Sequence, residues 1–231
     1  MQVSVVSENA VQVEFGRDID EALIPVIARA VELIRADLGP VLIDLIPSYT
    51  TLLCLYDYNR VDSQWMVNAV TRLLSVAEAE QSRGVSGRLV DIPVWYDPSV
   101  GYDLEALARE KSMSVDDVIE VHTGREYQVF AIGFNPGFAF LGRLDERIAT
   151  PRRNTPRKKV MRGSVGIADA QTAVYPLSSP GGWNIVGRSP QPMFDASCST
   201  GQASLLSVGD RVRFVPISRS EFITRGGLLD E

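Results

Sequence analysis

The segment 143–162 concentrates positive charge in a chain that is negative overall. The chain has 23 Lys and Arg against 29 Asp and Glu, a net charge of −6, yet this segment holds eight basic residues and two acidic ones. Most are arginines, whose planar guanidinium suits two-point recognition of carboxylate or phosphate oxygens. The segment predicts an anion site, and a solvated basic loop would have the same composition. Its basic residues are Arg143, Arg147, Arg152, Arg153, Arg157, Lys158, Lys159 and Arg162.

Two short segments combine aromatic residues with glycine and proline. Segment 133–140 has three phenylalanines, two glycines and a proline, so it cannot form a regular helix. Segment 178–183 reads Ser-Ser-Pro-Gly-Gly-Trp, and its glycines allow a close approach of backbone to ligand. Both segments predict walls of a pocket, with a barrel corner and a plain turn as the structural alternatives. The candidate wall residues are Phe134, Phe138, Pro180, Gly181, Gly182 and Trp183.

Three further side chains are candidates for chemistry. His122 is the one histidine of the chain, so we predict no multi-histidine metal site. It is either a proton carrier or a structural hydrogen bonder. Gln171 lies in a β-rich stretch, where its amide either holds a small polar ligand or satisfies backbone groups. Ser164 lies in Gly-Ser-Val-Gly, but Arg162 occupies the position where a nucleophile elbow needs a glycine.

Several classes of protein are excluded by missing features. No Gly-Lys dipeptide and no Gly-x-Gly occur, so the phosphate-binding and dinucleotide-binding loops are absent. The negative net charge argues against a nucleic-acid partner. The uncharged stretches 127–142 and 170–187 are too short or too polar to span a membrane. Cys54 and Cys198 are far apart, which excludes a disulfide scaffold and predicts a cytoplasmic protein.

The first 87 residues alternate β-rich and helical patterns. Segments 3–6 and 11–15 predict a hairpin, and 41–46 with 51–56 predict another. Between and after them, apolar residues recur at helical spacing over 19–38 and 65–77. This order predicts a small α+β sandwich of the ferredoxin-like kind as domain 1–87, with its boundary at the polar, glycine-rich segment 81–87.

The rest of the chain has a different pattern. Segment 88–96 alternates as a strand, and 104–111 and 115–120 predict short helices that Asp103 and Ser114 would cap. Short β-rich pieces then recur between glycines and prolines, which predicts a barrel or sandwich as domain 88–218. We expect residues 219–231 to be a loose C-terminal tail.

Residues 91–215 resemble the 5-oxoprolinase B-subunit family, which includes the sporulation kinase inhibitor protein and proteins labelled allophanate hydrolase subunit 1. The matching stretches follow one another in the family's order over more than half of the chain. They include Asp91-Ile92-Pro93-Val94, Gly101-Tyr102-Asp103-Leu104, Val121-His122-Thr123, Gly133-Phe134-x-Pro136-Gly137-Phe138, Pro151-Arg152-Arg153-x-x-Pro156-Arg157, Gly163-Ser164-Val165-Gly166, Gln171-Thr172, Ser179-Pro180-Gly181-Gly182-Trp183, Gly187-Arg188 and Gly209-Asp210-x-Val212.

This resemblance implies a cyclophilin-like β-barrel behind the small α+β domain, and a cytoplasmic subunit that is active only with a larger partner subunit. The implied reaction is the ATP-dependent opening of 5-oxo-L-proline to L-glutamate. A related allophanate hydrolase or urea amidolyase activity is also implied, because the module is similar to part of the carboxyltransferase region of urea carboxylase. ATP would act through the assembled complex, and this chain alone would bind no metal or prosthetic group.

The resemblance also implies roles for the candidate residues. Arg152, Arg153 and Arg157 would hold carboxylate or phosphoryl oxygens of a small anionic or amide substrate. Gln171 and the backbone of Gly181 and Gly182 would orient the ring amide. Trp183 would cover the ring, and His122 would form hydrogen bonds or transfer a proton. The remaining ligand contacts would come from Phe134, Phe138, Ser164 and Pro180.

Two departures from the family pattern add charge beside the expected pocket. Met161-Arg162 replaces the usual Pro-Ala, and Asp169 stands where small residues are usual. There are two alternative explanations for Arg162 and Asp169: an altered choice of substrate, or a salt bridge on the pocket rim. A rival function from another class is a regulatory protein whose barrel inhibits a histidine kinase, with the basic loop against an acidic surface.

Overall fold

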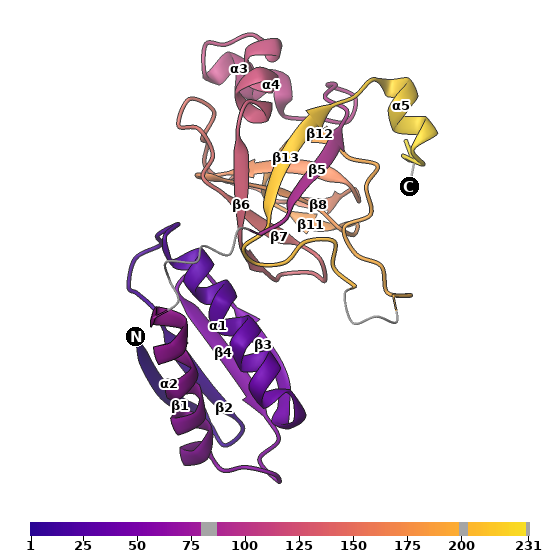
Figure 1. Cartoon of the computed structure of the whole chain (residues 1–231). Helices are drawn as coiled ribbons and strands as arrows, with labels where there is room; N and C mark the ends of the chain where they lie inside the picture. The colour runs from indigo at the N-terminus through magenta and orange to yellow at the C-terminus, as the bar shows by residue number, and fades with distance from the viewer. Residues whose placement is uncertain (80–86, 199–202, 230–231) are drawn as a thin grey trace. The chain divides into compact units, whose positions relative to one another are not determined.

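The computed structural model describes residues 1–79, 87–198 and 203–229. The chain divides into two compact units, Met1–Gly87 and Arg88–Glu231 (Figure 1). Among the described residues, no helix is both long enough and apolar enough to cross a membrane.

The first unit is a four-stranded sheet with two helices. Its strands lie in the order β1-β2-β4-β3, and every neighbouring pair is antiparallel. Both helices contact the sheet and each other, and Figure 1 shows them along one face. The elements are β1 (Gln2–Ser7), β2 (Ala10–Glu14), α1 (Leu23–Leu38), the short 3₁₀ helix η1 (Gly39–Val41), β3 (Leu42–Pro47), β4 (Thr51–Tyr56) and α2 (Ser63–Ala79).

Sequence periodicity accounts for this layer. Helix α1 buries Ile27, Ala30 and Ile34 at spacings of three and four, and it ends where Gly39 and the following proline begin η1. Alternate residues of β4 are buried, so one face of the sheet and the helix stripes share a core. The expected α+β class is confirmed for this unit.

The second unit is a seven-stranded mixed sheet rolled into a nearly closed barrel. Its strand order is β12-β9-β10-β7-β6-β13-β5, and β13 is parallel to β5. Trp95, just beyond β5, and Arg188 of β12 exchange two backbone hydrogen bonds of 2.8 and 2.9 Å, which joins the two end strands. The strands are β5 (Leu89–Val94), β6 (Glu126–Ile132), β7 (Ala139–Gly142), β9 (Ser164–Ala168), β10 (Gln171–Val174), β12 (Asn184–Arg188) and β13 (Arg211–Pro216).

Smaller elements complete this unit. Strands β8 (Arg157–Val160) and β11 (Ser179–Gly181) form a separate antiparallel pair. Helices α3 (Leu104–Glu110) and α4 (Val115–Thr123) contact β12 and β13, respectively. A reciprocal capping box between Ser114 and Asp117 starts α4, as predicted. Asp103 makes no side-chain cap on α3, so that cap prediction was wrong.

The segment expected to be a loose tail begins with a helix. Helix α5 (Arg219–Thr224) starts with a capping box between Ser218 and Glu221. Its Phe222 is buried, and the Phe222 and Trp95 ring centroids are 5.4 Å apart. Six residues with one buried aromatic carry no periodic signal, so the Ser-x-x-Glu capping box is the local sign of this helix.

Candidate functional site

A pocket of about 270 Å³ opens on the barrel unit. We call it the aromatic pocket. Five rings form much of its lining, and one arginine is the charged residue at its edge. The lining residues are Phe134, Phe138, Phe140, Arg152, Pro156, Tyr175, Pro180, Gly181, Gly182 and Trp183. The two aromatic segments that the sequence singled out therefore meet around one hollow.

The loop before β7 supplies one wall. Gly137 has φ +79°, and a Cβ there would lie 2.8 Å from the Met193 carbonyl oxygen, so only glycine fits this turn. The turn buries Phe138, whose ring meets Trp183 edge-on at a centroid distance of 5.6 Å. Phe134 is 65% exposed and touches Phe138 edge-on, so it lies on the rim.

The loop around β11 supplies the opposite wall. A Cβ on Gly181 would collide with the Tyr175 hydroxyl, so this glycine permits the ring and the loop to touch. Trp183 is only 5% exposed, which makes it part of the pocket floor. The resemblance implied a covering role for Trp183, and a ring this buried forms part of the pocket wall instead.

Arg152 is the cation of the rim. Its guanidinium carbon lies 5.9 Å from the Trp183 ring centroid, and its side chain is 60% exposed. Nε of Arg152 is 3.8 Å from Oδ2 of Asp169, an exposed pair that is weak in water. Asp169, one of the two departures from the family pattern, thus lies beside the rim cation. Arg162, the other, does not line this pocket.

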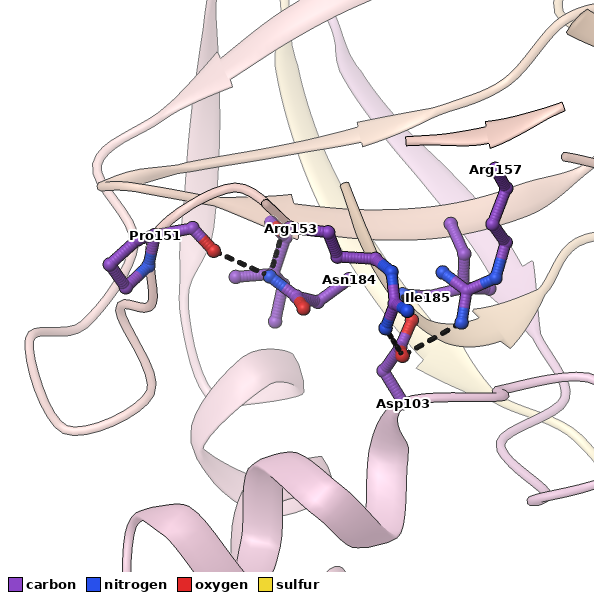
Figure 2. A network of polar contacts seen from close by, with 7 residues as sticks. Asp103, Pro151, Arg153, Arg157, Asn184 and Ile185 are labelled. Atoms are coloured by element: carbon purple, nitrogen blue, oxygen red, sulfur yellow. Dashed lines mark hydrogen bonds and ion pairs between the residues drawn. The ribbon is translucent and has the colours of Figure 1, made fainter. Parts of the chain in front are cut away.

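Arg153 and Arg157 are held elsewhere, by one buried carboxylate (Figure 2). Arg153 Nη1 donates to Asp103 Oδ1 at 2.6 Å, and Arg157 Nη2 donates to the same oxygen at 2.8 Å. The Ile185 backbone N–H donates to Asp103 Oδ2 at 2.7 Å. We call this group the Asp103 clamp. It ties segment 153–157 to the start of α3 and to β12, so neither arginine lines the aromatic pocket.

The clamp extends to the pocket loops. The Arg153 backbone N–H donates to the Gly182 carbonyl at 2.8 Å. Figure 2 shows the second link, in which Asn184 Nδ2 donates to the Pro151 carbonyl at 2.9 Å. Residues on both sides of Arg152 are therefore fixed. Sequence reasoning treated Asp103 only as a helix cap and missed this role. The available signal was an acid within a family motif, 50 and 54 residues before the two arginines that it binds.

His122 lies in the barrel core and not in the aromatic pocket. Its ring stacks on Phe214 at 4.6 Å, and its two nitrogens contact the Tyr96 hydroxyl at 2.7 Å and Thr172 Oγ1 at 2.9 Å. Burial lowers the pKa of His122 to about 3, so the imidazole is neutral at physiological pH. This geometry favours a structural role over proton transfer.

Two other candidates lie outside the pocket lining. Gln171 begins β10, where it pairs with Ala168 across the sheet. Ser164 is buried at the start of β9, and its Oγ finds no hydrogen-bond partner in the described part of the chain. Neither residue is among those that line the aromatic pocket, and their roles remain predictions.

Comparisons with known proteins place the chain in a family. Residues 1–205 match the carboxyltransferase domain family, subdomains C and D. The chain is 37% identical over 229 residues to the 5-oxoprolinase B-subunit of Bacillus subtilis, covering 96% of this chain and 95% of that protein. It is 27% identical over 134 residues to urea amidolyase of Saccharomyces cerevisiae, covering 54% of this chain and 7% of that protein.

A solved structure agrees with these matches. The crystal structure of TTHA0988 superposes with a TM-score of 0.80 at 32% identity, covering 92% of this chain. The chain spans only 40% of the TTHA0988 chain, so that protein holds the same module beside a larger remainder. These matches show that the chain belongs to the 5-oxoprolinase B-subunit family and carries the carboxyltransferase domain, subdomains C and D.

Proposed function

We propose that this chain is the smaller subunit of a cytoplasmic, ATP-dependent 5-oxoprolinase, which opens 5-oxo-L-proline to L-glutamate together with a larger partner subunit. The observation that carries the proposal is the 37% identity to the Bacillus subtilis protein over 96% of the chain. The aromatic pocket supports it, because a small lactam ring is flat and largely apolar while its carboxylate is anionic.

In this proposal the pocket positions the substrate. The ring stacks on Trp183 between the phenylalanines, and Arg152 holds the carboxylate at the rim. The Asp103 clamp keeps the Arg152 backbone in place without contacting substrate. The ring amide is a weak electrophile, and phosphorylation of its oxygen by ATP in the assembled complex would make attack by water feasible.

We propose that catalysis requires the larger partner subunit. Within the described residues, the pocket offers one arginine and no acidic side chain, which does not suffice to position ATP and activate water. TTHA0988, in which the similar module is 40% of the chain, supports a larger companion. We expect the isolated chain to fold but to hydrolyse no ATP with 5-oxoproline.

The test is a reconstitution. The chain is mixed with its larger partner, and ATP hydrolysis is measured with 5-oxo-L-proline, urea or allophanate. Activity with 5-oxo-L-proline only in the mixture supports the proposal. A urea-derived substrate is the second candidate, because of the similarity to yeast urea amidolyase. ATP hydrolysis by the mixture with urea or allophanate, but not with 5-oxo-L-proline, would favour it.

A matched pair of variants tests the pocket in the same assay. Arg152→Gln removes the rim cation, and Lys158→Gln removes an exposed charge that does not line the pocket. We expect a higher KM for 5-oxoproline only in the first variant. Equal KM values for the two variants would reject the pocket as the substrate site.

A further inference from the structure

A second pocket, of about 280 Å³, lies where the end of β12 meets helix α5. We call it the arginine pocket. Three of its lining residues are cationic, and within the part of the chain that the structure describes no acidic side chain lines it. The cations are Arg162, Arg188 and Arg225, and the apolar lining comes from Pro190, Pro192, Phe222 and Leu228.

Arg188 is the unusual member of this set. It is only 3% exposed. Its Nε donates to the Arg162 carbonyl at 3.1 Å and its Nη1 to the Leu229 carbonyl at 3.3 Å. Among the described residues it has no carboxylate partner, unlike Arg153 and Arg157. The cavity beside this buried guanidinium has room for an oxyanion, which a planar, permanently charged donor binds well.

The walls of the arginine pocket are held by contacts independent of any ligand. Phe222 packs against Trp95 and anchors α5. The Gln191 backbone N–H donates to Ser189 Oγ at 3.1 Å and fixes the opposite turn. Glu221, one helical turn from Arg225, accepts from the Ser218 backbone N–H at 2.8 Å in the capping box. The nearest acid of α5 is thus already engaged.

We propose that the arginine pocket binds the carboxylate or phosphate group of a small metabolite. Arg188 supplies a buried cation, Arg162 and Arg225 add charge from the rim, and the proline, phenylalanine and leucine side chains contact the carbon skeleton. This site is separate from the aromatic pocket, so the proposal does not depend on the reaction proposed above.

The test is calorimetric titration of the full chain with inorganic phosphate and with succinate, each at millimolar concentration. Arg225→Gln removes an exposed lining cation, so the fold is expected to survive. Arg219→Gln is the matched control, because it removes an exposed cation of the same helix that does not line the pocket. Arg152→Gln reports on the aromatic pocket.

We expect at least one anion to bind, Arg225→Gln to weaken its binding by about tenfold, and the other two variants to change it by less than about twofold. Tighter binding of phosphate assigns a phosphoryl group, and tighter binding of succinate assigns a carboxylate. The proposal is overturned if neither anion binds, if Arg225→Gln and Arg219→Gln bind equally well, or if Arg152→Gln abolishes binding.

Discussion

Arg152 and Arg153 are neighbours in sequence, yet they belong to two different environments. Arg152 stands at the exposed rim of the aromatic pocket, where it forms one weak, exposed ion pair with Asp169. Arg153 shares the buried Asp103 with Arg157, in contacts of 2.6 and 2.8 Å. A run of basic residues is therefore not one site. The fold places one of them at the lining of a pocket and two on a buried carboxylate, according to which acids it brings near them.

The largest expected effect is on the Asp103 clamp. Asp103→Ala removes a carboxylate that is 7% exposed and leaves two guanidiniums without it. We expect the free energy of unfolding to fall by ~3 kcal/mol or more, measured by urea denaturation. Asp91→Ala is the control, because its pair with Arg213 is half exposed and contributes less than ~1 kcal/mol. Equal losses in both variants would contradict a structural clamp.

The next prediction concerns how the free energy of unfolding depends on pH through His122, which lies in the barrel core and not in the aromatic pocket. The pKa of His122 is about 3 in the folded chain, against 6.5 ordinarily, so below pH 6.5 the unfolded state binds the extra proton. The free energy of unfolding should therefore decline as the pH falls from 6.5 towards 3, by about 1.4 kcal/mol per pH unit, because protonation of this histidine favours the unfolded state.

The measurement is the unfolding free energy of the wild type and of His122→Gln between pH 7 and 4.5. The wild type should lose stability more steeply, because the variant lacks the titrating group. Parallel curves would mean that His122 is accessible to protons in the folded state, and this would revive a role in proton transfer.

The rim arginine should act on ligands and not on stability. Arg152→Gln should weaken binding of 5-oxoproline by about 1.5–3 kcal/mol, the range for a charge-assisted contact, and leave unfolding almost unchanged. Isothermal calorimetry checks the first value and urea denaturation the second. The opposite pattern, a large stability loss with intact affinity, would make Arg152 equivalent to Arg153.

The smallest effect concerns the acid beside the rim. Asp169→Asn removes the partner 3.8 Å from Arg152, and asparagine tolerates the positive φ of this position. We expect anion affinity at the aromatic pocket to rise about two- to threefold, the scale of an exposed ion pair. Reduced affinity in the same titration would instead make Asp169 a direct ligand contact.

Much of the architecture was predictable from the sequence because its signals are local. The apolar stripe of α1, the stop at Gly39 and the capping box that starts at Ser114 each depend on residues a few positions apart. The composition of the two aromatic loops likewise indicated a pocket wall, since glycine widens and proline restricts the allowed backbone conformations, while the aromatic rings supply the apolar surface.

Other features were decided only by the tertiary structure. Asp103 lies 50 residues before Arg153 in the chain, and no local rule pairs them. Helix α5 is held by Phe222 on Trp95, and His122 is neutral because Phe214 and Thr172 enclose it from distant strands. Periodicity depends on sequence neighbours, whereas charge pairing and solvent exclusion depend on residues that meet only after folding. The sequence therefore determined most of the elements, and the fold determined which arginine lines the aromatic pocket and which two are held by Asp103.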